Sequence, residues 1–198
     1  MARTAGSTGT ETLERLQDAA LELFAREGYA AVSMRAIAAR TGVQAGAIYK
    51  YFPTKQDILF DLLAGHMLAL EAAWREGAGS ELSDFVRFHV RYHLTRPREM
   101  FISYMELRSL EPENFRRIRE LRRGYEAIPR QMIEEGIAKG AFNVVDTEVT
   151  TRAIIALLNG LTTWYREDGR LSLDEIETVY ITLVNRMVGA GEEEEENV

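Results

Sequence analysis

The stretch that decides the fold runs from residue 28 to residue 55 and reads GYAAVSMRAIAARTGVQAGAIYKYFPTK. Ser33 is a good N-cap for a short helix, and Gly42 is placed to end that helix, because glycine adopts the left-handed conformation that helix ends favour. After only one more residue, 44–52 (QAGAIYKYF) predicts another short helix, which Pro53 closes. Two short helices joined by a tight turn that contains glycine are the outline of a helix-turn-helix motif.

A longer helix is predicted upstream of this motif. Thr10 has a side chain suited to an N-cap, and Gly28 stands where a left-handed residue ends a helix. Between them the apolar residues are spaced three and four apart, as in an amphipathic helix. These residues are Leu13, Leu16, Ala20, Leu23 and Phe24. Because 1–9 is small and polar, we expect a disordered arm there and a three-helix helix-turn-helix domain at 10–54.

Helical periodicity continues beyond this domain and is interrupted only by glycine and proline breaks. The predicted helices are 55–76, 81–95, 98–109, 112–139, 146–168 and 172–189. We find no strand pattern and no internal repeat. The glutamate run 192–196 is too highly charged to pack, so 191–198 is predicted to be a disordered acidic tail. The fold class is therefore all-α, with a larger helical domain at 55–190.

Composition excludes several classes of protein. The 198 residues include no cysteine, which excludes disulfides, thiolate metal sites and cysteine nucleophiles. No apolar run approaches the roughly 20 residues of a membrane helix, and nothing at the N-terminus resembles a signal peptide. We expect a cytoplasmic protein with no membrane partner.

The net charge of −7 is divided unevenly along the chain. Residues 1–55 hold seven basic and five acidic side chains, whereas 56–198 hold 17 basic and 26 acidic ones. Five of those acids belong to the tail. This asymmetry favours a nucleic-acid module attached to an acidic body.

Residues 44–51 have the character of an element that reads the major groove of DNA, which needs a slim leading edge with polar side chains around it. Ala45 and Gly46 let the backbone approach the bases. Gln44 is suited to an adenine edge or a phosphate, and Lys50 to a guanine or a phosphate.

Other residues nearby are suited to the phosphate backbone. The hydroxyls of Tyr49 and Tyr51 can reach phosphate oxygens, and Lys55 would neutralise a phosphate. The amides that follow Ser33, at the start of its helix, also attract anions. The candidate DNA-binding residues are therefore Ser33, Arg35, Gln44, Ala45, Gly46, Tyr49, Lys50, Tyr51 and Lys55. From these residues alone, a helical hairpin with exposed tyrosines and no DNA-binding role remains an alternative.

The spacing Gly28-Tyr-x-x-x-Ser-x-Arg-x-Ile-Ala-x-x-Thr-Gly-Val-x-x-Gly-x-Ile-Tyr-x-Tyr-Phe-x-x-Lys55 resembles the DNA-binding signature of TetR-family transcriptional regulators. The agreement covers roughly residues 10–60. Two positions differ from the common pattern, because Gln44 replaces a capping serine and Ala45 replaces a base-reading Lys or Arg. The resemblance implies a homodimer that reads a palindromic operator and releases it when a small-molecule inducer binds the body.

Two C-terminal segments are strongly apolar. Segment 146–168 is apolar almost all round, and 172–189 carries a clean apolar stripe. The family resemblance implies that both form a four-helix dimer interface with a second copy. The alternative is that both belong to the core of one monomer.

The middle helices are rich in aromatic and long apolar side chains, which are typical both of core packing and of a large apolar ligand pocket. Five of the eight residues in the segment 116–123 are arginines. They form either a solvated face paired with neighbouring glutamates or an anion site for ligand phosphates or a carboxylate.

Two body motifs, 104–114 (YMELRSLEPEN) and Thr163-Trp-Tyr-Arg-x-x-Gly-x-Leu-Ser, resemble the TetR branch that regulates steroid and fatty-acid degradation. That resemblance implies an acyl-coenzyme A inducer. The candidate ligand-binding residues are Trp74, Phe88, Tyr92, Phe101, Tyr104, Met105, Arg108, Arg119, Arg123, Tyr125, Trp164 and Arg166.

No catalytic residue, metal site or cofactor is predicted. His89 and His93 are four apart, but no third ligand is evident and no nucleophile or phosphate-loop motif occurs. We therefore expect a ligand-responsive DNA-binding regulator, by family default a repressor, rather than an enzyme. The alternatives are a repressor of an efflux gene induced by a hydrophobic drug-like ligand, and a helical ligand carrier or enzyme with a vestigial DNA module.

Overall fold

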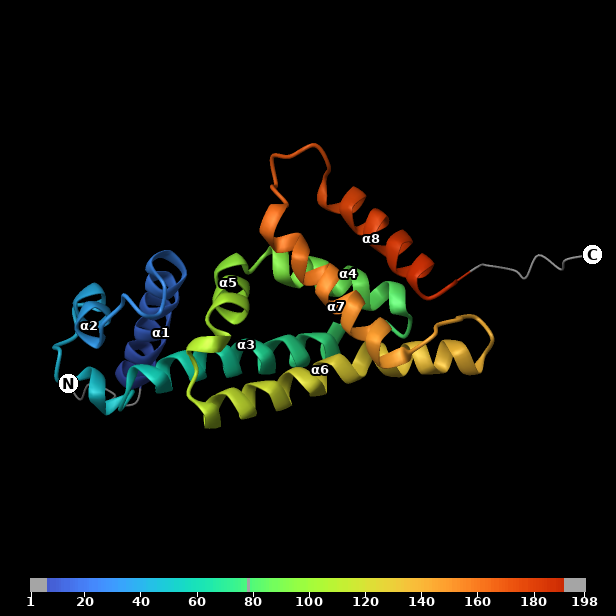
Figure 1. The fold of residues 1–198 in the computed structure, drawn as a ribbon. Helices are drawn as coiled ribbons and strands as arrows, with labels where there is room; N and C mark the ends of the chain where they lie inside the picture. The colour runs from blue at the N-terminus through green and yellow to red at the C-terminus, as the bar shows by residue number, and fades with distance from the viewer. Residues whose placement is uncertain (1–6, 78, 191–198) are drawn as a thin grey trace, which may run out of the picture. The chain divides into compact units, whose positions relative to one another are not determined.

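A computed structural model describes residues 7–77 and 79–190. Their regular secondary structure is helical, with no strand among them (Figure 1). The α-helices are α1 (Ser7–Glu27), α2 (Met34–Thr41), α3 (Lys55–Gly77), α4 (Leu82–Leu94), α5 (Pro97–Met105), α6 (Pro112–Ala138), α7 (Thr147–Trp164) and α8 (Leu173–Met187). Two short 3₁₀ turns, η1 (Ile48–Lys50) and η2 (Leu107–Ser109), lie between them. The all-α fold class is confirmed. Within the described ranges, no helix is both long enough and apolar enough to cross a lipid bilayer.

The chain divides into two compact units. Unit 1 combines Met1–Ala69 with Pro97–Leu121, and unit 2 combines Leu70–Arg96 with Arg122–Val198. Unit 1 thus joins the helix-turn-helix to a segment from the middle of the chain. The boundary between 10–54 and 55–190 is based on the helix-turn-helix motif in the sequence, and it stays a prediction.

Unit 1 is built around α1, which packs against α2 and α5. Its buried apolar side chains include Leu16 and Phe24 of α1, Ile37 of α2, Ile58 of α3 and Ile102 of α5. Burying a side chain of this size stabilises the fold by about 1.5–3 kcal/mol. The stripe of α1 expected from the sequence therefore faces the core of this unit.

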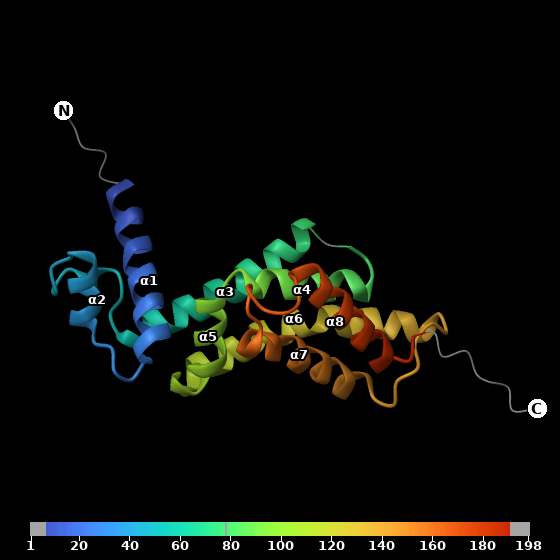
Figure 2. The ribbon, with the colours of Figure 1, turned by 90° about the horizontal axis from the view of Figure 1, so that it is seen from above.

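In unit 2, α4 packs against α7 and α8, and α7 packs against α8 (Figure 2). Besides apolar contacts, one ion pair joins two of these helices. Glu177 of α8 is only 4% exposed and lies 2.5 Å from Arg91 of α4, whose guanidinium also contacts Asp174 at 2.7 Å. The hydrogen bond to Glu177 raises the pKa of Arg91 above its ordinary value. A buried carboxylate needs such a partner, because an isolated buried charge is very costly.

The first helix starts earlier than predicted. α1 begins at Ser7, so the predicted arm is wrong for residues 7–9, and 1–6 lie outside the described residues. An earlier start adds no unpaired amides, because the first four amides of any helix lack an acceptor within the helix. Its cost is therefore limited to the low helix propensities of residues 7–9. The predicted tail at 191–198 also lies outside the described residues.

The predicted helix at 44–52 is wrong in type. Residues 45–47 form turns and only Ile48–Lys50 is helical, as a 3₁₀ turn. The amides of Ala47 and Lys50 bond the carbonyls three residues back, at 2.8 and 3.2 Å. Gln44 is a poor N-cap, Gly46 has low helix propensity and Pro53 stops the helix, so a full α-helical ladder is not supported.

The cap predicted at Ser33 is confirmed, since its Oγ accepts from the Ala36 amide at 3.1 Å. We predict that Ser33→Ala lowers the free energy of unfolding by about 1 kcal/mol, because the amide loses its acceptor. Urea denaturation followed by circular dichroism measures this loss. Ser80→Ala, at an exposed serine between helices, is the control. Equal stability of the two variants would contradict the assignment.

Candidate functional site

The segment between α2 and α3 presents polar side chains on a rigid base. Gln44, Gly46 and Lys50 are exposed, and Tyr49 is 54% exposed. Ile48, between them, is fully buried in the core of unit 1. The backbone that carries the predicted base-reading residues is therefore anchored at its centre, while their side chains point outward.

The short helix α2 that precedes this segment is held at both ends. Ser33 caps its start, and Gly42 ends it with φ +71°, a conformation that disfavours residues with a Cβ. The guanidinium of Arg15 donates to the Thr41 carbonyl, and that of Arg40 donates to Glu22 at 2.7 Å. Both bonds tie α2 to α1. The whole motif is thus fixed relative to the longer helix.

The remaining phosphate-contact candidates differ in exposure. Ala45 and Arg35 are exposed, as predicted for groups that meet DNA. Tyr51 is half-buried and packs against the core of unit 1, so it contributes to the anchor as well as to the surface.

The ammonium of Lys55 forms hydrogen bonds with groups of the protein itself. It donates to the carbonyls of Tyr29 and Val32, each at 2.8 Å, and lies 4.2 Å from the centre of the Tyr29 ring. A third carbonyl, that of Ala30, lies at 3.5 Å. The expected role in neutralising a phosphate stays a prediction, while in this structure the N–H groups of Lys55 bind main-chain oxygens. Lys55 positions the connector between α1 and α2.

The sequence reasoning missed two further residues at this connector. Glu106 accepts from the Tyr29 amide at 2.9 Å, and Gln56 donates to the Tyr29 hydroxyl at 2.9 Å and to the Ser109 carbonyl at 2.6 Å. Glu106 directly precedes η2, and Ser109 is its last residue. No sequence signal identifies such partners, because they lie 27, 53 and 77 residues apart and depend on the fold.

Four candidate ligand residues gather in unit 2. Trp74, Phe88 and Tyr92 form a chain of ring contacts with centroids 5.3 and 5.5 Å apart. Trp74 also contacts Phe85 at 5.5 Å, and Phe85 contacts Tyr125 at 5.4 Å. These rings pack against one another, so they contribute to the core of the unit. Their predicted ligand contacts stay a prediction.

The paired histidines take part in this aromatic cluster. His89 is buried, with one ring nitrogen 3.1 Å from the Tyr125 hydroxyl and the other 3.1 Å from Asn159 Oδ1. Its ring stacks on that of His93 at 4.0 Å. Burial raises the pKa of Tyr125 well above its ordinary value, so the phenol stays protonated and can donate to His89.

Other candidate ligand residues lie in unit 1 instead. These are Phe101, Tyr104, Met105, Arg108 and Arg119, and all of them are exposed. Trp164 and Arg166, in unit 2, are exposed too; the Arg166 guanidinium donates to the Tyr165 carbonyl at 2.9 Å. The structure therefore does not bring the predicted ligand set together within either unit.

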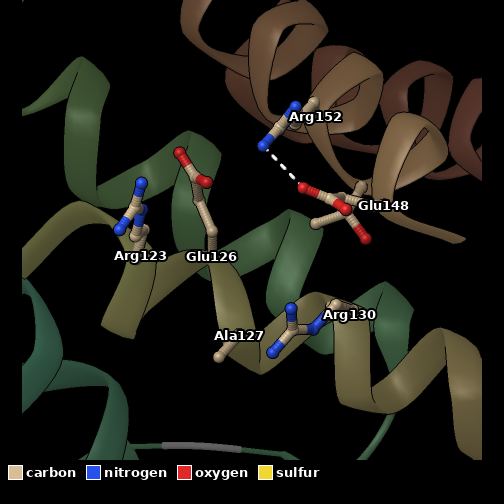
Figure 3. A pocket seen from close by; sticks show the side chains of 7 residues that line it. Arg123, Glu126, Ala127, Arg130, Glu148 and Arg152 are labelled. Atoms are coloured by element: carbon tan, nitrogen blue, oxygen red, sulfur yellow. Dashed lines mark hydrogen bonds and ion pairs between the residues drawn. The ribbon is translucent and has the colours of Figure 1, made fainter. Parts of the chain in front are cut away.

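The arginines of the segment 116–123 differ in the groups that they contact. Arg116 pairs with Glu113, Arg117 lies 4.2 Å from the Phe60 ring centre, and Arg119 lies 5.7 Å from that of Phe115. Arg123 lines a cavity of about 330 Å³ between α6 and α7 (Figure 3). The expected pairing with a neighbouring glutamate is seen at Arg116, whereas Arg117 and Arg119 lie near aromatic rings and Arg123 faces a concave site.

Comparisons with known proteins agree with this architecture. Residues 16–62 match the family model of bacterial regulatory proteins of the tetR family, and residues 77–188 match that of the tetracyclin repressor-like C-terminal domain.

Relatives cover nearly the whole chain. The HTH-type transcriptional repressor KstR2 of Rhodococcus jostii is 27% identical over 191 residues, which cover 91% of this chain and 92% of the relative. The fatty acid metabolism regulator protein of Bacillus subtilis is 27% identical over 164 residues, 79% of this chain and 84% of the relative. Both are regulators rather than enzymes by name.

Solved structures share the fold. A bacterial regulatory protein in the tetR family from Rhodococcus RHA1 has a TM-score of 0.85 at 29% identity, covering 91% of this chain and 98% of that one. AibR, crystallised with isovaleryl coenzyme A and operator DNA, has a TM-score of 0.77 at 19% identity, covering 90% and 99%. The second likeness shows the fold alone. With one family model over the helix-turn-helix and another over more than half of the chain, the protein belongs to the tetR family of bacterial regulatory proteins.

Proposed function

We propose that the protein is a transcriptional repressor that binds a palindromic operator as a homodimer and releases it when an acyl-coenzyme A thioester binds. The observation that carries the DNA-binding part is the exposed segment Gln44–Lys50, anchored by the buried Ile48 and placed between α2 and α3. An element of this kind suits the major groove. A role on DNA would place the protein in the cytoplasm.

The inducer class rests on two kinds of support. The body motifs resemble regulators of steroid and fatty-acid degradation, and a relative over most of the chain is named a fatty acid metabolism regulator. A protein of the same fold binds isovaleryl coenzyme A together with operator DNA. A thioester of lipid or steroid catabolism accounts for both.

The homodimer is supported by α8. Val179, Leu183 and Met187 are 42%, 38% and 36% exposed and are spaced four apart, so they form one apolar stripe outside the core. On α7, Val149 is exposed together with the small residue Ala153. An apolar stripe beside small residues suits packing against the same helices of a second copy, in an isologous interface.

Operator binding can be tested with duplexes selected from a random DNA pool. We expect the protein to bind its selected site about a thousandfold more tightly than a scrambled duplex. Gln44→Ala should weaken specific binding about tenfold, because a base-edge contact is lost. Fluorescence polarisation measures both, with Gln131→Ala on α6 as the control.

Addition of acyl-coenzyme A should release the DNA. Failure to prefer any selected duplex would refute the DNA-binding role, and failure of every thioester to release it would refute the inducer class.

Lys50 and Lys55 should behave differently. Lys50→Gln is expected to weaken operator binding and to reduce the salt dependence by about one phosphate contact, with stability unchanged. Lys55→Gln should lower the free energy of unfolding by about 1–3 kcal/mol, because partly buried carbonyls lose a charged donor. Salt-series polarisation and urea denaturation separate the two effects. A stable Lys55→Gln protein with a reduced salt slope would show that Lys55 contacts phosphate after all.

The dimer prediction concerns the stripe on α8. Leu183→Glu places a charge in the apolar contact, so it should convert the dimer to monomer and weaken operator binding at least about tenfold. Sedimentation velocity measures the mass. Thr178→Glu, also exposed and on another face of α8, should remain dimeric. A dimeric Leu183→Glu protein would exclude this stripe as the interface.

A further inference from the structure

We propose that the cavity between α6 and α7 lined by Arg123, Arg130 and Arg152 binds the phosphorylated nucleotide end of the inducer. This inference rests on the proposed function, in which the inducer is a coenzyme A thioester. It assigns a recognition site to that ligand within unit 2.

The residues that line the cavity come from two helices and all belong to unit 2 (Figure 3). Arg123, Glu126 and Arg130 project from α6, and Glu148 and Arg152 from α7. Its volume of about 330 Å³ lies at the lower end of the roughly 300–1,000 Å³ of ligand pockets. The site therefore has room for a nucleotide fragment rather than for a whole acyl-coenzyme A.

The guanidinium groups at this cavity differ in how far they are already paired. Among the described residues, no carboxylate lies within 4 Å of Arg123. Arg130 has only a long contact, 3.8 Å to Glu134, which is outside the lining. Arg152 is paired with Glu148 at 2.6 Å. Arg123 and Arg130 thus keep donors for an incoming anion, and a guanidinium binds phosphate oxygens in bidentate fashion.

The lining is mixed rather than purely basic. Three arginines face two carboxylates, those of Glu126 and Glu148, which leaves a net charge of +1. Two carboxylates would repel a bare anion, but they accept hydrogen bonds from hydroxyl and amino groups. A nucleotide carries both kinds of group, phosphates for the arginines and ribose hydroxyls and a base amino group for the glutamates. The lining therefore fits a nucleotide better than a free fatty acid or inorganic phosphate.

Another arginine of α6 provides a matched control. Arg116 is exposed, as Arg123 and Arg130 are, but it pairs with Glu113 and does not line the cavity. Replacing it removes the same charge from the same helix. Any effect specific to the cavity must therefore be absent from Arg116→Gln.

Isothermal titration calorimetry of the full chain with free coenzyme A tests the proposal. Coenzyme A should bind the unaltered protein, and Arg123→Gln and Arg130→Gln should each weaken binding about tenfold, since each removes a charged hydrogen-bond donor. Arg116→Gln should bind as the unaltered protein does. Pantetheine, which lacks the nucleotide, should bind all four proteins equally weakly. Circular dichroism verifies that each variant is folded.

Equal coenzyme A affinity in all four proteins, or no binding of coenzyme A to any of them, would overturn the inference. The proposed function is judged separately, by release of operator DNA from the unaltered protein. Release by an acyl-coenzyme A that is equally effective on the Arg123→Gln protein would refute the cavity but retain the inducer. Arginine-dependent binding of coenzyme A without any release would retain the cavity and refute the inducer.

Discussion

The ammonium of Lys55 and the carbonyls it binds hold the DNA-facing part of the molecule in place. The connector between α1 and α2 is short, and its carbonyl oxygens at Tyr29 and Val32 lie outside both helices, with that of Tyr29 accepting also from the Val32 amide at 3.3 Å. Lys55, at the first position of α3, satisfies both at 2.8 Å. Because Val32 directly precedes the capping residue Ser33, fixing this connector fixes the start of α2. The position of the segment that follows α2 depends on that start.

The same connector is bound from a second direction. Glu106 accepts from the Tyr29 amide, and its other oxygen accepts from the Ser109 hydroxyl at 2.7 Å. Gln56 donates to the Ser109 carbonyl and accepts from the Glu111 amide at 3.0 Å. This shared bonding explains why 97–121 belongs to the same compact unit as the helix-turn-helix. A displacement of η2 would break bonds at the connector itself, so the polar network joins η2 mechanically to α2.

Local signals predicted what local interactions determine. Ser33 and Gly42 bounded α2 correctly, because a cap depends only on the residues next to it. The α-helix expected at 44–52 was wrong. The signature of the motif does not reveal that Gly46 and the poor N-cap Gln44 favour a 3₁₀ turn. Lys55 shows a contact that the sequence did not predict. A basic residue beside a DNA-binding motif predicts a phosphate contact, but carbonyls of the folded connector compete for it.

The candidate ligand residues show a different limit. Helical spacing predicts which side chains share a face of one helix, but not which helices share a compact unit. Met105 and Tyr125 are 20 residues apart and fall in different units, whereas Arg123 and Arg152 are further apart and line one cavity. Sequence distance is therefore a poor guide to a site built between helices.

The basic side chains of residues 7–55 differ in the groups that they contact. Part of the modest excess of basic side chains in this segment is used within the protein. Arg26 and Arg40 pair with glutamates, whereas Arg15 and Lys55 donate to uncharged carbonyls and keep their positive charge. Arg35 and Lys50 are exposed, so their side chains are accessible to phosphates. Counterion release grows with the number of such contacts, so each protomer gains little affinity from it. Tight operator binding must then come from base contacts and from two linked recognition segments, which makes dimerisation a condition of function.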